Sequence, residues 1–387
     1  MDTLKRIYRS YLRYRSSLSS YLNQKNTYEK TRKRIADFFE KGELPFTDSL
    51  PTELSVGHEV TIRCNLRCKM CYQGQSRAAR REELKTDEVL EVYDKIPDSV
   101  NQIKLVGGEP FVRKDILDLI SFWNNKGIRV NIQSNCTLID DKTITQLKNF
   151  DNIRRIQSSV DGPPLVHDHI RGVEGSYDRL SNSIEKIKHE LENTYVNLYA
   201  TLLMDENLEE LTGLVDTLAQ LKPSSATLIL EKVNTEKDVI ETYRILSDVL
   251  SWKEEDIVLN TQLRENLFPS NITPSRLRRE LKKAQLYALG KGLFLIINPL
   301  DYYFNLDEYF FGQPDKIFCK KLLNNELRIN EKGDVIWCDI IGKSFGNLLE
   351  KSFEEIWLSR DFQNFRKFLM NGSLPVCKRC CKTFVRK

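Results

Sequence analysis

Three cysteines lie within eight residues, Cys64, Cys68 and Cys71, in the spacing C-x3-C-x2-C. They directly follow the run from Leu54 to Ile62, whose alternating apolar pattern predicts a β-strand. Three thiolates on one short loop can ligate three irons of an iron–sulfur cluster and leave the fourth iron open. Structural zinc needs four ligands, usually two separated C-x-x-C pairs, and no second pair follows nearby. An open-site cluster is the favoured interpretation, with zinc or incidental cysteines as alternatives.

A second group of cysteines lies in the last 70 residues of the chain: Cys319, Cys338, Cys377, Cys380 and Cys381. The segment 327–338, with Gly333 at a turn, predicts a β-hairpin that ends at one of them. A hairpin pair and a C-x-x-C together predict one tetrahedral metal site, for which zinc and an iron–sulfur cluster both remain open.

Chain length and composition limit the class of protein. The 387 residues allow two or three domains, and 40% hydrophobic with 29% charged residues is typical of a soluble globular protein. Apolar runs such as 293–297 are too short to cross a membrane, and no signal segment opens the chain, so we expect a cytoplasmic protein. In that reducing compartment nine cysteines indicate metal binding. A net charge of +4 does not require a nucleic-acid partner.

The elements that must position these cysteines alternate between strand and helix patterns. Strands are predicted at 59–62, 102–106, 129–134, 153–158, 196–203 and 226–230. Helices are predicted between them at 86–95, 114–126, 140–148, 175–191 and 209–221. Such alternation predicts parallel strands with right-handed crossovers, so the loops after the strands should carry the chemistry.

Each of the next three strands ends in a polar or glycine-rich run. The second strand leads into Gly107, Gly108, Glu109 and Pro110, where glycines allow close backbone approach to a ligand and the carboxylate is a charge-assisted acceptor. Taken alone, such a pair of glycines is more often only a turn. The third strand ends in Ser134, Asn135 and Cys136, and the fourth in Ser159 and Asp161, followed by Arg171. His167 and His169, between these last two, are predicted to be loop residues without a metal role.

On these runs, the chain resembles the radical SAM enzymes, whose signature is C-x3-C-x-Φ-C. Met70 is Φ here, and the resemblance makes it a candidate cofactor-binding residue. The resemblance implies an α/β fold, an open (β/α)6 partial barrel of TIM type at 51–232. It also implies a [4Fe–4S] cluster on Cys64, Cys68 and Cys71 whose open iron binds S-adenosylmethionine. Reductive cleavage of that cofactor gives a 5′-deoxyadenosyl radical, which abstracts a substrate hydrogen in an oxidoreductase-like reaction.

The resemblance also assigns roles to residues. The run from Gly107 to Pro110 matches the GGEP motif that holds the methionine amino group, while Ser134 and Asn135 fall near the ribose. Ser159, Asp161 and Arg171 match a cofactor-binding run of the family, in which Ser159 and Arg171 are candidates for the methionine carboxylate because an arginine fork suits a carboxylate. Relatives usually have glycine where this chain has Cys136, so Cys136 is either a tolerated small residue or a catalytic hydrogen-atom donor.

The tail resembles a shortened SPASM extension, which implies an auxiliary [4Fe–4S] cluster. A full extension has a further cysteine six residues after Cys380, where this chain has Arg386. We therefore expect one auxiliary cluster, held by Cys319, Cys338, Cys377 and Cys380. Cys381 is an alternative fourth ligand, or a second candidate catalytic thiol. The extension is expected at 319–387, after a linking helical and aromatic region at 233–318.

The N-terminal residues 1–50 form a basic segment with helical spacing, expected either to pack on the barrel or to contact an anionic partner. The favoured function is modification of a peptide or protein by oxidation, cross-linking or epimerisation, with a flavodoxin- or ferredoxin-type electron donor. The alternative is a dehydrogenase or epimerase of a small molecule such as an aminocyclitol or sugar. A zinc-stabilised RNA-binding protein is a third, non-enzymatic hypothesis.

Overall fold

The computed structural model describes residues 50–51, 54–73, 82–324 and 326–385, together with isolated positions between 26 and 37. The basic segment predicted at 1–50 therefore lies almost wholly outside the described residues. Among the helices within these ranges, none has the length and apolar content needed to span a membrane.

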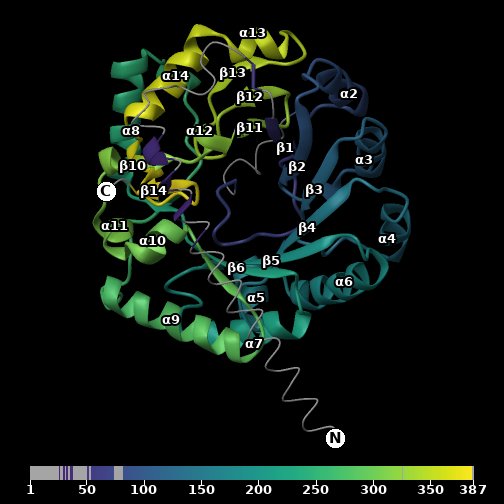
Figure 1. Ribbon diagram of the computed structural model, residues 1–387, viewed down its shortest axis with the longest axis vertical. Helices are drawn as coiled ribbons and strands as arrows, with labels where there is room; N and C mark the ends of the chain where they lie inside the picture. The colour runs from purple at the N-terminus through teal and green to yellow at the C-terminus, as the bar shows by residue number, and fades with distance from the viewer. Residues whose placement is uncertain are drawn as a thin grey trace, which may run out of the picture.

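Six parallel strands form the centre of the molecule, in chain order across one curved sheet (Figure 1). They are β1 (Leu54–Thr61), β2 (Val100–Gly107), β3 (Arg129–Gln133), β4 (Ile153–Ser159), β5 (Tyr195–Leu202) and β6 (Ser225–Leu230). Each pairs in parallel with the next, and a helical crossover joins every pair. This is the α/β partial barrel that the sequence predicted.

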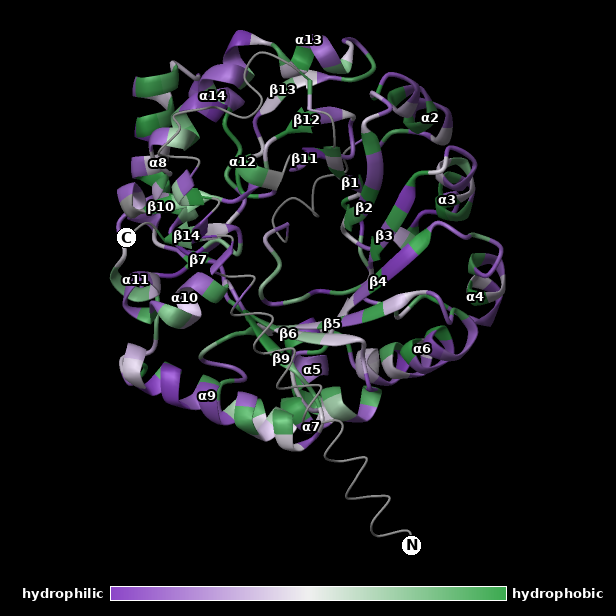
Figure 2. Ribbon diagram, viewed as in Figure 1, coloured by the Kyte–Doolittle hydropathy of each residue, from purple (hydrophilic) through white to green (hydrophobic). Residues whose placement is uncertain are grey.

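Helices cover the outer face of these strands, because each presents an apolar stripe to the sheet. Within α3, for example, Leu119, Ile120 and Trp123 are fully buried. Hydrophobic and hydrophilic residues alternate along these helices in Figure 2. The covering helices are α2 (Thr86–Asp94), α3 (Ile116–Asn125), α4 (Asp141–Leu147), α5 (Pro164–Arg171), α6 (Ser176–Glu190) and α7 (Leu211–Leu221).

The sheet continues beyond the six strands at both edges. At one edge β9 (Leu295–Asn298) pairs in parallel with β6, so the region expected to be a linker at 233–318 supplies a seventh parallel strand. At the other edge β11 (Glu326–Ile329) pairs in parallel with β1 and continues into β12 (Asp334–Ile336) and β13 (Ser344–Asn347). The hairpin predicted around Gly333, which has φ +86°, is thus part of the main sheet.

The remaining elements pack beside the open side of the barrel (Figure 1). Strand β10 (Ile317–Cys319) pairs antiparallel with β14 (Thr383–Val385), and β7 (Val233–Asn234) pairs with β8 (Gln262–Leu263). The helices of this part are α8 (Glu236–Leu250), α9 (Pro274–Gly290), α10 (Leu300–Phe304), α11 (Leu306–Phe311), α12 (Lys321–Asn324), α13 (Phe353–Trp357) and α14 (Arg360–Asn371). Of the dense aromatics of α10 and α11, Tyr302, Tyr309 and Phe310 are buried, whereas Phe304 and Phe311 are exposed.

Candidate active site

The three clustered cysteines lie on the loop that leaves the carboxyl end of β1, and all three are half-buried. Backbone hydrogen bonds tie this loop to the end of α5: the Arg67 amide donates to the Arg171 carbonyl at 3.0 Å and the Lys69 amide to the Ile170 carbonyl at 2.9 Å. From the other side, the Gln262 side-chain amide donates to the Cys71 carbonyl at 2.7 Å. The loop is therefore fixed in place by its neighbours.

Gly107 and Gly108 fix the second turn directly against the cysteine loop. The Gly108 amide donates to the Thr61 carbonyl at 2.7 Å, and the Glu109 amide to the Arg63 carbonyl at 2.8 Å. A Cβ added to Gly108 would lie 2.0 Å from the Arg63 carbonyl oxygen, and Gly107 has φ +109°. The glycines therefore allow the two loops to touch. Both also line the cavity, so their predicted contact with a ligand stays a prediction.

Glu109 joins the second and third turns. Its carboxylate accepts hydrogen bonds from the Ser134 hydroxyl at 2.8 Å and the Asn135 amide at 2.7 Å. It also caps the short helix η2 (Pro110–Val112), in which Pro110 is buried. Burial raises the pKa of Glu109 to about 7, although these hydrogen bonds oppose the shift. Glu109 reaches the cavity wall, whereas Pro110 does not.

The third turn also reaches the cysteines. The Asn135 side-chain amide donates to Asn65 Oδ1 at 2.9 Å and lies 3.9 Å from Cys64 Sγ. The next residue, Cys136, has φ +59°, the left-handed conformation expected of a glycine position. Its thiol is fully buried, lies outside the cavity lining, and has a pKa raised to about 12 by burial. The structure thus favours packing over a catalytic role for Cys136.

The fourth strand supplies an ion pair at the cysteine loop. Both oxygens of the fully buried Asp161 are used: Oδ2 accepts from Arg171 Nε at 2.6 Å, and Oδ1 accepts from the Thr201 amide at 2.8 Å. Arg171 in turn donates to Cys68 Sγ at 3.5 Å. Arg171 and Ser159 line the cavity and Asp161 lies behind them, so Asp161 positions the arginine instead of facing a ligand. The segment predicted as a loop here is helix α5, with His167 buried and His169 exposed.

The five tail cysteines are half-buried and come from four places: β10, the turn after β12, η5 (Pro375–Cys377) and the turn before β14. The Ile341 amide donates to Cys338 Sγ and the Lys382 amide to Cys380 Sγ, both at 3.4 Å. Cys380 and Cys381 both face the cavity, so either can be the fourth ligand.

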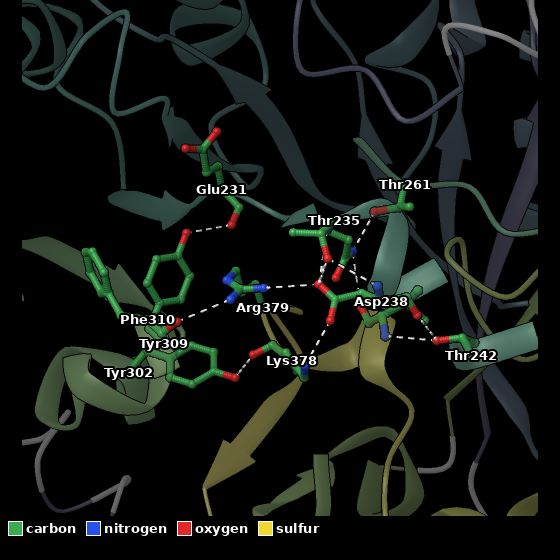
Figure 3. A network of polar contacts seen from close by, with 12 residues as sticks. Glu231, Thr235, Asp238, Thr242, Thr261, Tyr302, Tyr309, Phe310, Lys378 and Arg379 are labelled. Carbon is green, nitrogen blue, oxygen red and sulfur yellow. Dashed lines mark hydrogen bonds and ion pairs between the residues drawn. The ribbon is translucent and has the colours of Figure 1, made fainter. Parts of the chain in front are cut away.

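A polar network holds the two residues inside the final C-x-x-C (Figure 3). Lys378 Nζ lies 2.8 Å from Asp238 Oδ1, and Arg379 Nη1 lies 3.8 Å from Asp238 Oδ2. Arg379 also donates to the Phe310 carbonyl at 3.3 Å, while the Tyr302 hydroxyl donates to the Lys378 carbonyl. Asp238 thereby connects α8 to the tail cysteines.

Both groups of cysteines line a single cavity of about 950 Å³ between the barrel and the tail. Its wall includes Met70, Gly107, Gly108, Ser134 and Asn135, which the resemblance had assigned to S-adenosylmethionine. Within the described ranges, no three His, Cys, Asp or Glu residues gather closely enough to hold a single metal ion. A [4Fe–4S] cluster makes a different demand, because each of its cysteines binds a separate iron. Half-buried thiols at one cavity wall, with amide groups near their sulfurs, fit that demand.

Several charged residues of this wall were missed by the sequence analysis. Lys232 Nζ lies 2.8 Å from Asp339 Oδ2 and 5.2 Å from the ring centre of Tyr72, which follows the cysteine loop. Arg328 Nη1 pairs with Glu59 at 2.7 Å. Burial alone would raise the pKa of Asp339, but Lys232 and Arg328 outweigh it and hold that pKa well below its usual value. Lys232 and Asp339 are 107 residues apart in the chain, and Glu59 and Arg328 are 269 apart, so no local pattern could reveal these two pairs.

Comparison with known proteins agrees with this geometry. Residues 58–218 match the radical SAM superfamily, and residues 319–381 match SPASM, an iron-sulfur cluster-binding domain. The AdoMet-dependent heme synthase of Nitratidesulfovibrio vulgaris is 34% identical over 139 residues, 35% of this chain and 38% of that protein. This chain thus spans under half the length of the first curated relatives it matches.

Two further likenesses extend over most of the chain. The PqqA peptide cyclase of Xanthomonas campestris is 25% identical over 352 residues, 86% of this chain and 81% of that protein. The crystal structure of Streptococcus suis SuiB bound to precursor peptide SuiA has a TM-score of 0.58 at 18% identity, covering 92% of this chain and 75% of SuiB. At that identity the structural likeness shows a shared fold.

Proposed function

Because this chain belongs to the radical SAM superfamily and carries a SPASM domain, we propose that it modifies a peptide or protein by abstracting a hydrogen atom. The observation that carries the proposal is the single cavity, which both groups of cysteines line. A substrate in that cavity lies between a site for S-adenosylmethionine and the cysteines of the tail.

The residues of the barrel hold and orient the cofactors in this proposal. Cys64, Cys68 and Cys71 hold a [4Fe–4S] cluster, which with S-adenosylmethionine supplies a 5′-deoxyadenosyl radical when both are bound. Arg171, fixed by Asp161, presents its guanidinium to the methionine carboxylate. Ser159 lies on the same wall, and Glu109 holds the second and third turns in register through Ser134 and Asn135.

We also propose a single auxiliary [4Fe–4S] cluster in the tail. Cys319, Cys338 and Cys377 supply three ligands, and Cys380 or Cys381 supplies the fourth. A flavodoxin- or ferredoxin-type protein is the proposed electron donor. Lys232, which pairs with Asp339, places positive charge beside Cys380 and Cys381, which offsets the negative charge of thiolate ligands there.

A peptide substrate is supported by the likeness to the PqqA peptide cyclase, which extends over most of both chains. The proposal is tested by incubating the reduced, anaerobically reconstituted enzyme with S-adenosylmethionine and short peptides encoded beside its gene. We expect formation of 5′-deoxyadenosine together with a mass change in one peptide. Formation of 5′-deoxyadenosine that responds only to a small molecule, such as an aminocyclitol, would contradict the peptide assignment.

A further inference from the structure

The inner face of the barrel is polar several residues below the level of the cysteines. Alternate residues of each strand point to the cavity, and on β2, β3 and β4 these include Gln102, Lys104, Asn131, Arg155 and Gln157. Figure 2 shows hydrophilic stretches on the same three strands. Inward-pointing barrel residues commonly form an apolar core, so a polar inner face indicates contact with a polar ligand.

Five positions form one row across neighbouring strands. Strand pairing places Arg328 beside Gly57, Gly57 beside Lys104, Lys104 beside Asn131, and Asn131 beside Arg155. Neighbouring strands lie about 4.8 Å apart, so the backbones of Lys104 and Arg155 are separated by roughly 10 Å. Two long cationic side chains can reach one group from that separation.

The cavity wall carries ten Lys or Arg residues and six Asp or Glu residues. Most of these cations lie near a cysteine or pair with an acid. Lys232, Lys321 and Lys382 lie near tail cysteines, and Arg171 lies near Cys68, where positive charge offsets thiolates. The acids nearest the row are also engaged, because Glu59 pairs with Arg328 at 2.7 Å and Glu326 pairs with Lys382 at 2.6 Å.

Lys104 and Arg155 differ from these residues in having no direct side-chain partner, although Cys381 and Glu326 are among the charged groups near Lys104. Neither side chain makes a hydrogen bond or ion pair with another residue in the part of the chain that the structure describes. Lys104 is half-buried, and burial together with the nearby Lys382 and Arg328 lowers its pKa to about 8. An anion bound beside Lys104 would stabilise its protonated, positively charged form.

We propose that Lys104 and Arg155 form a subsite for an oxyanion of the substrate, a carboxylate or a phosphate. This inference deepens the proposed function and rests on it for the identity of the cavity. Lys104 precedes Gly107 by three residues and Arg155 precedes Ser159 by four, so the subsite lies about 10–13 Å below the level assigned to S-adenosylmethionine. An acidic side chain of a peptide or an anionic small molecule supplies the same chemistry.

The test compares charged and neutral probes that are otherwise matched, using the reconstituted full-length chain and isothermal titration calorimetry at pH 7. One pair is acetyl-Gly-Glu-Gly-amide against acetyl-Gly-Gln-Gly-amide, the other is glutarate against glutaramide, and inorganic phosphate is measured alone. Since a hydrogen bond to a charged group is worth more than one to a neutral group, we expect the charged member of at least one pair to bind about tenfold more tightly. The pair that shows the preference identifies the source of the anion.

Substitutions test whether Lys104 and Arg155 cause the preference for the charged probe. Lys104→Gln and Arg155→Gln should each reduce the preference to below about threefold, while Lys104→Arg should retain it. Arg154→Gln is the matched control, because Arg154 is the neighbour on β4, is exposed like Arg155, and lies outside the cavity wall. Equal binding of charged and neutral probes, or a preference that survives both Gln substitutions, would overturn the inference. Binding needs no turnover, so failure to form 5′-deoxyadenosine would count against the proposed function alone.

Discussion

Cys136 takes the backbone conformation expected at its motif position, while its thiol packs away from the cavity. Its φ of +59° lies in the left-handed region that favours glycine, and its thiol is fully buried beside the Ser134 carbonyl, 3.7 Å away. The nearby cavity is lined by Ser134 and Asn135 and does not include Cys136.

Cys136→Ala should therefore leave catalysis almost unchanged. We expect 5′-deoxyadenosine formation within about twofold of the wild-type rate, and a loss of about 1 kcal/mol in the free energy of unfolding from the missing sulfur. The measurement is the initial rate under saturating cofactor. A rate reduced by tenfold or more in a folded, iron-replete variant would restore the catalytic thiol hypothesis.

His58 is a buried histidine on β1 that should limit stability in acid. Its Nδ1 lies 3.0 Å from the Tyr93 hydroxyl, and burial, with a smaller effect of Arg113, lowers its pKa to about 3. Because the unfolded chain binds this proton near pH 6.5, the stability that the neutral ring provides is present above pH 6.5 and is lost as the pH falls towards 3.

Between pH 6.5 and 5 the wild type should lose about 2 kcal/mol more unfolding free energy than His58→Gln loses. Urea unfolding at the two pH values measures this difference. His189→Gln is the control, since the His189 side chain is 83% exposed, and it should follow the wild-type profile. Parallel pH profiles for the wild type and His58→Gln would contradict the assignment.

Among the elements, the turn after β2 supports the cysteine loop by direct backbone contact. Gly108→Ala would place a Cβ 2.0 Å from the Arg63 carbonyl oxygen, where only backbone movement can relieve the clash. We expect a loss of about 2–3 kcal/mol in unfolding free energy and iron missing from the first cluster only. Gly290→Ala, in helix α9 with nothing near the added Cβ, is the matched control and should retain full iron content. A Gly108→Ala variant with full iron content and the unfolding free energy of the wild type would contradict this role.

Helix α8 supports the other group of cysteines through Asp238. Asp238→Asn removes the charge that holds Lys378 and Arg379, and weakens the capping box with Thr235. We expect the tail to lose most of its iron while Cys64, Cys68 and Cys71 keep theirs, together with about 1 kcal/mol of helix stability. Asp248→Asn, an exposed change on the same helix, should lose neither. Iron and sulfide analysis gives the answer, and an unchanged tail content would show that the network does not position these cysteines.

For the whole molecule, sequence patterns predicted what is local. The six barrel strands follow from apolar periodicity, and the cysteine loop and the glycine turn follow from short motifs at strand ends. The hairpin at Gly333 was also predicted, because the turn needs a positive φ that glycine readily takes.

Sequence patterns could not predict pairings between distant segments. The joining of β9 to β6 and of β11 to β1 depends on which sheet edge is free, and this is decided only by the packed molecule. Asp238 and Lys378 are 140 residues apart, and the row from Arg328 to Arg155 arises from strand register. The position of Asp161 behind Arg171 depends on packing for the same reason.

The central claim is that one cavity connects two iron–sulfur centres held by two separate groups of cysteines. The most direct test is the iron and sulfide content of the anaerobically reconstituted protein, compared with the Cys64→Ala/Cys68→Ala/Cys71→Ala variant and with Cys377→Ala/Cys380→Ala. We predict about eight irons in the wild type and about four in each variant, because each set of substitutions removes one [4Fe–4S] cluster. About four irons in the wild type, with almost none left in the first variant, would contradict a cluster in the tail.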